Sequence, residues 1–129
     1  MNNWIPAAVV IVAGLATAAG PAAAQSGEAA KGQRVFNTQC RSCHTLEKDG
    51  SQATGPNLHG LFGRKAGASA GYDYSEPMKN SGIVWDDKTL AEYNRDPKGR
   101  VPGTKMLYNG VKNAGQLADL VAYLKEATK

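Results

Sequence analysis

The clearest periodic pattern in this chain lies near its C-terminal end. Its apolar positions recur with the i, i+3, i+4, i+7 spacing of one helical face: Leu117, Leu120, Val121 and Leu124. Before them, Asn113 and, three residues later, Gln116 resemble a capping box that begins a helix. The pattern therefore predicts a C-terminal helix whose apolar face must pack on another element.

A second helix is predicted from Ser26 to about Cys40. Ser26 is suited to cap its N-terminus, and Glu28 falls in the first turn, where an acidic side chain complements the helix dipole. Gly32 and Phe36 lie four residues apart and therefore share one face of this helix.

Two shorter helices are expected in the middle of the chain. One occupies residues 75–82, where a serine can cap the helix, a proline is tolerated in the first turn and a glycine can end it. The other begins at residue 86 or 87, carries Leu90 and Tyr93 on one face and stops before Pro97.

The segments between these helices are long and rich in turn-forming residues. Residues 45–71 hold many glycines and no hydrophobic periodicity, and residues 100–110 read RVPGTKMLYNG. No run alternates like a strand, so the chain is predicted to be all-α, with four or so short helices and long ordered loops. Such loops are uncommon in a compact domain unless something else orders them, and a buried cofactor would do so.

The N-terminal segment differs in composition from the rest. Residues 1–27 carry no Lys, Arg, Asp or Glu, and residues 5–24 are almost wholly apolar. The segment ends in PAAAQSG, with Ala22 and Ala24 in the small-x-small arrangement that signal peptidases cut. We therefore predict a cleaved export signal over residues 1–24 and one domain over residues 25–129. An uncleaved membrane anchor is the alternative, because about 20 apolar residues can span a bilayer.

All 15 basic and 11 acidic residues lie in the predicted domain and give it a formal charge of +4. A domain this small buries a limited share of its surface, so a large apolar cofactor would complete a thin core. The modest positive charge suits steering towards an acidic partner. No groove-reading motif is present, so nucleic-acid binding is not expected.

The only two cysteines, Cys40 and Cys43, lie in TQCRSCHTL directly before His44. A thioredoxin-like switch needs this spacing in a βαβ setting, and no strand is predicted. A zinc site needs four ligands, and His59 is the only other histidine. A disulfide would close a tiny loop with little gain in stability. Cys-x-x-Cys-His is instead the c-type haem attachment signature, in which two thioethers hold the haem and the histidine lies beneath its iron.

Three residues are candidates for the opposite axial position: His59, Met78 and Met106. Met106 is favoured because it lies in VPGTKM, where a proline stiffens the loop that presents its thioether. Met78 lies in a predicted helix, where methionine commonly fills gaps in the core, and His59 suits a surface role. Thioether ligation raises the reduction potential and closes the iron to other ligands, as an electron carrier requires. A haem enzyme or gas sensor with an open sixth position is the alternative.

Six stretches in order along the chain make the sequence recognisable: CRSCHTL, GPNLHGLFGRKAG, GYDYSEPMKNSGIVW, LAEYNRDP, VPGTKM and LADLVAYLK. Over residues 27–129 it closely resembles the small class I cytochromes c, the mitochondrial protein and its soluble bacterial periplasmic counterparts. The resemblance implies the small single-haem fold and a monomeric one-electron carrier rather than an enzyme.

The resemblance also implies roles by position. One haem c would be bound covalently through Cys40 and Cys43, with His44 and Met106 as axial ligands. The carbonyl of Pro56 would accept the His44 Nδ1–H and fix the tautomer. The remaining implied pocket residues are Arg64, Tyr74 and Trp85 at the haem propionates, and Tyr93 and Thr104 on the methionine side.

Two further implications concern packing. Gly32 and Phe36 would pack on Leu120 and Tyr123 where the terminal helices cross. Met78 departs from the family pattern, because many relatives have an asparagine facing the haem pocket there. An apolar residue at this position is expected to change the potential modestly and to leave the axial ligation unchanged.

The resemblance finally implies partners and a location. A basic face around the haem edge would dock on acidic patches, through Arg34, Lys98, Lys105 and Lys112. The partners would be membrane redox complexes, namely a cytochrome bc-type reductase and either a terminal oxidase or a photosynthetic reaction centre. With the predicted export signal, the expected location is the periplasm, and a retained N-terminal segment would tether the protein to the membrane.

Overall fold

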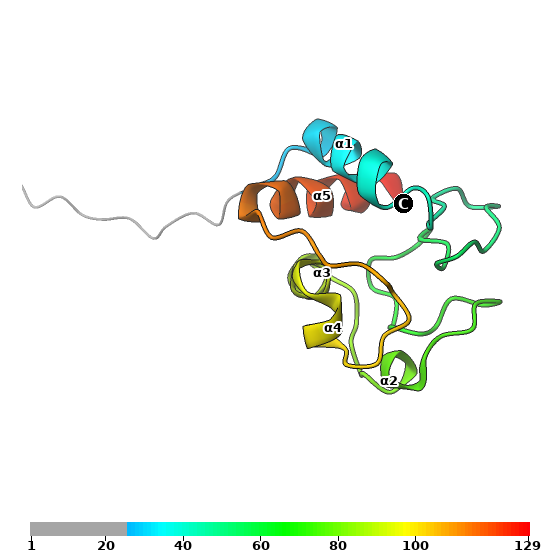
Figure 1. Cartoon of the computed structure of the whole chain (residues 1–129). Helices are drawn as coiled ribbons and strands as arrows, with labels where there is room; N and C mark the ends of the chain where they lie inside the picture. Colours follow the sequence, from blue (N-terminus) through cyan, green and yellow to red (C-terminus); the bar gives the residue numbers. More distant parts are fainter. Residues whose placement is uncertain (1–25) are drawn as a thin grey trace, which may run out of the picture.

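The computed structural model describes residues 26–129, which contain five helices and no β-strand (Figure 1). The helices are α1 (Ala29–Gln39), α2 (Glu76–Lys79), α3 (Asp87–Arg95), α4 (Pro97–Arg100) and α5 (Ala114–Ala127). The predicted all-α class is confirmed. No helix between residues 26 and 129 has the length and hydrophobicity needed to cross a membrane. The predicted segment 1–24 and its boundary lie outside the described residues.

Helices α1 and α5 cross at the top of Figure 1 and form the most extensive contact between elements. Phe36 and Leu120 are almost completely buried there, and the Phe36 ring lies 5.6 Å from that of Tyr123. A Cβ at Gly32 would lie 1.8 Å from the carbonyl oxygen of Asp119. The helices therefore approach this closely only because position 32 has no side chain. The predicted crossing of the terminal helices is confirmed.

Three of the four helices whose starts were predicted from cap residues begin with a hydrogen bond to a side chain. At α3, Asp86 accepts the Thr89 N–H at 2.7 Å and the Thr89 hydroxyl accepts the Asp86 N–H at 2.9 Å, which completes a capping box. Ser75 caps α2 and Asn113 caps α5, as predicted, but at α5 the Gln116 side chain does not return a bond to Asn113, so the predicted capping box is only half formed.

The predicted start of α1 is wrong. The N-cap is Glu28 rather than Ser26, and its side chain makes no capping hydrogen bond. Instead, the Glu28 N–H donates to the Asp119 carboxylate of α5 at 2.7 Å. A contact with a distant helix thus satisfies a backbone donor that a local cap would otherwise satisfy.

Helix α4 was not predicted, because Pro97 ends the pattern of α3. Its start nevertheless has two ordinary signals. The Asp96 carboxylate accepts the Gly99 N–H at 3.1 Å, and Pro97 occupies the first helical position. Helices α3 and α4 therefore follow each other directly, with Asp96 serving both as the end of one and the cap of the other.

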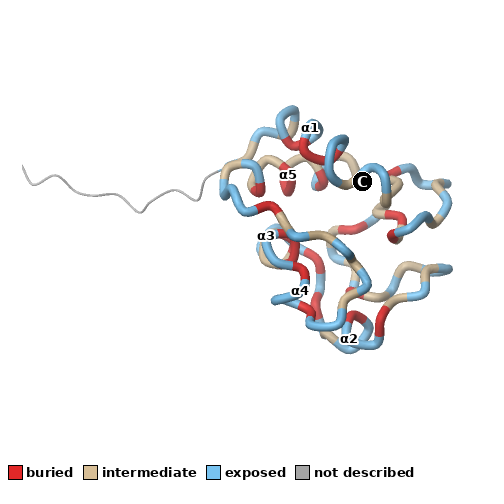
Figure 2. The backbone as a smooth tube through the Cα atoms, in the orientation of Figure 1, coloured by how far each residue is buried: buried red, intermediate tan, exposed pale blue. Residues whose placement is uncertain are grey.

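The long loops are held by backbone hydrogen bonds and by buried apolar side chains. The Gly63 N–H donates to the Trp85 carbonyl at 2.7 Å, and the Ala66 N–H donates to the Ile83 carbonyl at 2.8 Å. These bonds flank an isolated β-bridge between Lys65 and Val84. Figure 2 shows that buried residues line the inner sides of the helices and loops, so both enclose one interior.

Candidate functional site

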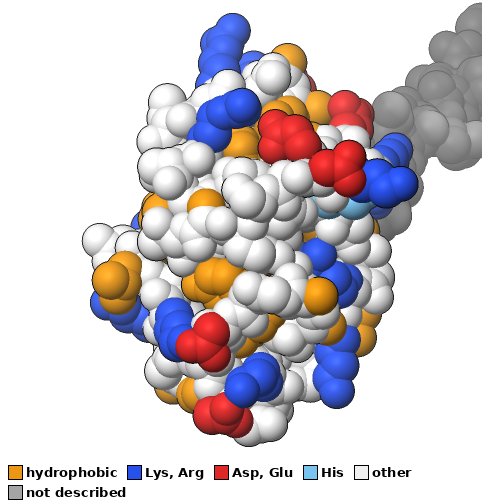
Figure 3. Space-filling view, turned by 90° about the vertical axis from the view of Figure 1, so that its right-hand side faces the viewer, with side chains coloured by type: hydrophobic (Ala, Val, Ile, Leu, Met, Phe, Trp, Pro, Cys, Tyr) orange, Lys and Arg blue, Asp and Glu red, His pale blue; other side chains and the backbone are white. Residues whose placement is uncertain are grey.

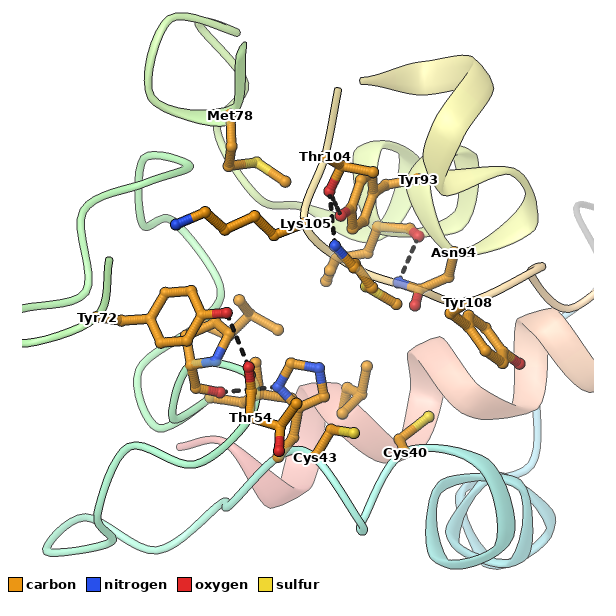
Figure 4. Close-up of a pocket in the computed structure, with 18 of the residues that line it drawn as sticks. Cys40, Cys43, Thr54, Tyr72, Met78, Tyr93, Asn94, Thr104, Lys105 and Tyr108 are labelled. Atoms are coloured by element: carbon orange, nitrogen blue, oxygen red, sulfur yellow. Dashed lines mark hydrogen bonds between the residues drawn. The ribbon is translucent and has the colours of Figure 1, made fainter. Parts of the chain in front are cut away.

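A cavity of about 330 Å³ lies between α5, α3, the end of α1 and the loops. A volume of this order is typical of sites for small molecules and cofactors. All ten predicted site residues line it: Cys40, Cys43, His44, Pro56, Arg64, Tyr74, Trp85, Tyr93, Thr104 and Met106. Figure 4 shows the two cysteines on one wall, with Met78, Tyr93 and Thr104 on the opposite wall.

The cysteines lie on a turn that follows directly from α1. The Cys40 and Arg41 N–H groups both donate to the Phe36 carbonyl, and the Cys43 and His44 N–H groups both donate to the Cys40 carbonyl. These bonds continue the helix as tight turns and bring Cys40, Cys43 and His44 to the cavity together.

Both cysteines are free thiols, and Cys40 is poorly suited to redox exchange. Burial, and secondarily the nearby Cys43, raises the pKa of the Cys40 thiol to about 11. A thiol–disulfide switch needs an accessible thiolate of lowered pKa, which this environment opposes. Nor do three or more His, Cys, Asp or Glu side chains gather around a possible metal position in residues 26–129. The geometry therefore favours neither a thioredoxin-like switch nor a zinc site.

His44 is held in one orientation. Its Nδ1 lies 2.8 Å from the Pro56 carbonyl oxygen, and because a carbonyl only accepts, Nδ1 carries the hydrogen and Nε2 keeps its lone pair. Burial lowers the pKa of His44, although the Pro56 carbonyl partly opposes this, so the neutral ring is favoured. A Cβ at Gly55 would lie 2.5 Å from Cε1 of His44, so the ring lies against backbone that only glycine permits.

Two of the three candidates for the opposite position line the cavity, and the third does not. Met78 and Met106 are lining residues, whereas His59 is not. Met78 is buried, and Met106 lies in a partly exposed loop. The backbone N–H of Met106 donates to the Thr104 hydroxyl at 3.3 Å, and that hydroxyl lies 2.7 Å from the Tyr93 hydroxyl. Helix α3 thus helps to orient the Met106 loop through Tyr93.

The three residues that the resemblance implies at the haem propionates are each held by a different contact. The Arg64 guanidinium donates to the His59 carbonyl at 2.9 Å and to the Asn57 carbonyl at 3.2 Å. Tyr74 stands edge-on to Tyr72, with ring centroids 4.8 Å apart. Trp85 is buried and packs 5.3 Å from the Tyr93 ring.

Two further contacts around the site, one at Tyr72 and one at the predicted docking residue Lys105, were not predicted from the sequence. The Tyr72 hydroxyl donates to the Thr54 carbonyl at 2.8 Å and closes one side of the cavity (Figure 4). The Lys105 ammonium donates to both the carbonyl and the carboxylate of Asp73, each at 2.8 Å. These pairs join segments far apart in sequence, so no local pattern indicates them.

The four predicted docking cations are all exposed, but they are not equivalent. Arg34 and Lys98 have no acidic partner among the described residues, and Lys112 donates to the Arg95 carbonyl at 2.6 Å. Lys105 instead forms an ion pair with Asp73. Figure 3 shows a face on which basic and acidic side chains are interspersed around apolar ones, so positive charge is not uniform over the molecule.

The comparisons with known proteins all point to the same family. The sequence profile of the family described as Cytochrome c matches residues 29–128. Cytochrome c of Gibberella zeae is 52% identical over 103 residues, which cover 80% of this chain and 97% of that protein. Cytochrome c of Nigella damascena is 48% identical over 105 residues, covering 81% and 95%. Cytochrome c of Theileria parva is 53% identical over 102 residues, covering 79% and 88%.

These relatives contradict the predicted location. They are eukaryotic proteins, and eukaryotic cytochrome c belongs to the mitochondrial intermembrane space, not to a periplasm reached by a signal peptide. The prediction of a periplasmic protein with a signal peptide is therefore wrong. It rested on the hydrophobicity and small residues of the first 24 positions, and these properties do not specify which membrane system a protein meets.

The helical architecture, the cavity lined by the predicted site residues and the family match over nearly all of the described residues agree. The relatives are covered almost end to end, so the likeness concerns the whole domain. This chain belongs to the class I cytochromes c, electron carriers that hold a covalently bound haem c.

Proposed function

We propose that one haem c is attached through Cys40 and Cys43, with His44 and Met106 as its axial ligands. The observation that carries this proposal is the His44–Pro56 hydrogen bond of 2.8 Å, which leaves Nε2 as the nitrogen with a free lone pair. Two free thiols lie beside this histidine on the same cavity. The cleft beside Gly55 that a Cβ would fill accommodates the imidazole ring. These features fit the chemistry by which a haem c is attached and ligated.

Bound in this cavity, the haem supplies a one-electron couple between ferric and ferrous iron. The residues around it hold it and exclude competing ligands. Met106 would supply the second ligand to the iron, and the Tyr93–Thr104 pair steadies the Met106 backbone. With both axial positions filled, oxygen and substrates have no site on the iron, which favours electron transfer over catalysis.

Arg64, Tyr74 and Trp85 are proposed to hold the haem propionates. Buried carboxylates are costly unless they receive hydrogen bonds or a positive charge. Arg64 supplies that charge from a guanidinium already oriented by two backbone carbonyls. Tyr74 and Trp85 line the same cavity and carry O–H and N–H donors for which the described residues offer no hydrogen-bond partner.

We further propose docking to acidic surfaces of membrane-bound respiratory complexes, a bc-type reductase as donor and a terminal oxidase as acceptor. Arg34, Lys98 and Lys112 keep their positive charge uncompensated by acidic side chains of residues 26–129, and Lys105 does not. The association rate should therefore fall as ionic strength rises. Lys98→Ala should slow association more than Lys105→Ala, and equal effects would contradict this assignment.

Absorption spectra of both oxidation states test the ligand assignment. The ferric protein should show the weak far-red methionine–iron band, and Met106→Ala should abolish it. Met78→Ala is the matched control, because Met78 lines the same cavity and should leave the band in place. A band that persists in Met106→Ala, or is absent from the parent protein, would overturn the assignment. Carbon monoxide binding by the ferrous protein at neutral pH would instead indicate an open sixth position.

A further inference from the structure

The segment of residues 101–112, called here the Met106 segment, is tied to the rest of the molecule by several hydrogen bonds, one of which is the Tyr93–Thr104 bond described above. Lys105 donates to Asp73 at 2.8 Å, the Tyr108 hydroxyl donates to the side-chain carbonyl of Gln39, and Lys112 donates to the Arg95 carbonyl at 2.6 Å. Between these ties the segment is poorly buried, and Leu107 is 90% exposed. Segments with few buried contacts open at low free-energy cost.

Both ends of the Met106 segment are fixed more firmly than its middle. At one end, Gly103 has φ +87°, and a Cβ there would lie 2.9 Å from the Pro77 ring. At the other end, a Cβ at Gly110 would lie 2.2 Å from the Arg95 carbonyl oxygen, and the Val111 N–H donates to Asn94 at 2.8 Å. The Tyr93–Thr104 hydrogen bond also holds the first end, so any opening of the segment involves chiefly residues 105–109.

The Tyr108–Gln39 hydrogen bond joins the Met106 segment to the end of α1. Gln39 is the last residue of α1 and directly precedes Cys40, and both Gln39 and Tyr108 line the cavity. Figure 4 places Tyr108 on the same side of the cavity as Cys40. Among the described residues, no other hydrogen bond joins α1 or Cys40 to the Met106 segment. Elsewhere the two are joined only through apolar side chains.

We propose that Tyr108 and Gln39 form a clasp that holds Met106 at its axial position and sets how readily other ligands replace it. This inference rests on the proposed ligation by Met106. An external ligand reaches the iron only when the Met106 segment opens, so its apparent affinity depends on the population of the open state. Breaking the clasp raises that population.

Imidazole binding to the ferric haem-loaded protein tests the clasp. Tyr108→Phe keeps the ring but removes the donor, and Gln39→Leu removes the acceptor. Since the net value of one exposed hydrogen bond is small, each variant should bind imidazole about two- to fivefold more tightly. The double variant should bind no more tightly than either single one, because one interaction is lost in all three. Amide hydrogen exchange of residues 106–108 should accelerate in the same variants.

Two matched controls separate the clasp from general loosening. Tyr123→Phe removes a hydroxyl at the α1–α5 crossing that has no hydrogen-bond partner among the described residues, and Gln33→Leu removes an exposed amide of α1. Both should bind imidazole as the parent does. Parental affinity and exchange in Tyr108→Phe and Gln39→Leu would overturn the clasp while leaving Met106 ligation intact. If the spectrum of the parent protein lacks the far-red band, the proposed ligation by Met106 is itself wrong. If Tyr108→Phe does not load haem, Gln39→Leu tests the same bond.

Discussion

The close approach of α1 and α5 makes Gly32→Ala a demanding test of the fold. An alanine Cβ would lie 1.8 Å from the Asp119 carbonyl oxygen, 2.4 Å from its carbon and 2.7 Å from the Tyr123 Cβ. Two of these three atoms belong to the backbone of α5, so no side-chain rotation can relieve the contact. The two helices must therefore move apart by more than an ångström.

The expected loss of unfolding free energy follows from the packing contacts that this movement removes. Phe36 and Leu120 are the most completely buried side chains at the crossing. A gap of 0.5–1 Å already forfeits roughly a quarter to a half of each dispersion contact. Overpacking a core costs about 1–3 kcal/mol, and the upper part of that range applies because the obstacle is backbone. The higher helix propensity of alanine offsets at most about 1 kcal/mol of this destabilisation. We expect a net loss of about 2 kcal/mol.

Denaturant unfolding of the haem-loaded protein measures this loss. Gly115→Ala is the matched control, because Gly115 also lies in a terminal helix and its Cβ would meet only the Asn113 cap side chain, at 3.2 Å, a contact that a shift of a few tenths of an ångström relieves. That variant should change the free energy of unfolding by no more than about 0.5 kcal/mol in either direction. Equal unfolding midpoints for the two variants would refute the argument from close approach.

Three further changes probe the site and a cap. Gly55→Ala should displace the His44 ring and destabilise the protein by about 1–3 kcal/mol, and an unchanged midpoint in denaturant would contradict the tight packing. The Thr89 N–H and hydroxyl lower the pKa of Asp86 below its ordinary 3.8, so its contribution to stability is full above pH 3.8 and is lost as pH falls below that value. Asp86→Asn keeps an acceptor at the cap, so the difference between parent and variant in thermal melts should shrink or reverse below pH 3.8, and a constant difference would argue against it. Met78→Asn should shift the reduction potential, keep the far-red band and cost about 1–3 kcal/mol through a buried amide; an unchanged potential would contradict a pocket role.

Much of the helical framework could be predicted because it depends on local chemistry. The apolar spacing of residues 117–124 and the cap at Asn113 belong to one continuous stretch, and α5 forms where they predict it. The same is true of α3, whose capping box is complete within four residues. Helix α1 shows the limit, because its first backbone N–H is satisfied by Asp119, 91 residues away.

The residues of the candidate site also fall into two groups, those that a local motif indicates and those that no local pattern selects. Cys-x-x-Cys-His is contiguous because α1 and the turn after it present all three side chains together, so spacing alone indicated the chemistry. Pocket residues such as Arg64 and Tyr93 came from the resemblance to a family, and no local pattern would have selected them. The location was predicted wrongly from hydrophobicity alone, which carries no information about the membrane system involved.

Local patterns in the sequence place the starts of α3 and α5, indicate that no strand forms among the described residues, and bring two thiols and an imidazole together. The folded chain adds that Gly32 must lack a side chain, that Gly55 lies against the His44 ring, and that Lys105 forms an ion pair with Asp73. It also brought Tyr108 to Gln39 across 69 residues. The physical reason is that caps and turns are satisfied by neighbours in the chain, whereas close packing, ion pairing and the closure of a cavity depend on segments that meet only when the whole chain has folded.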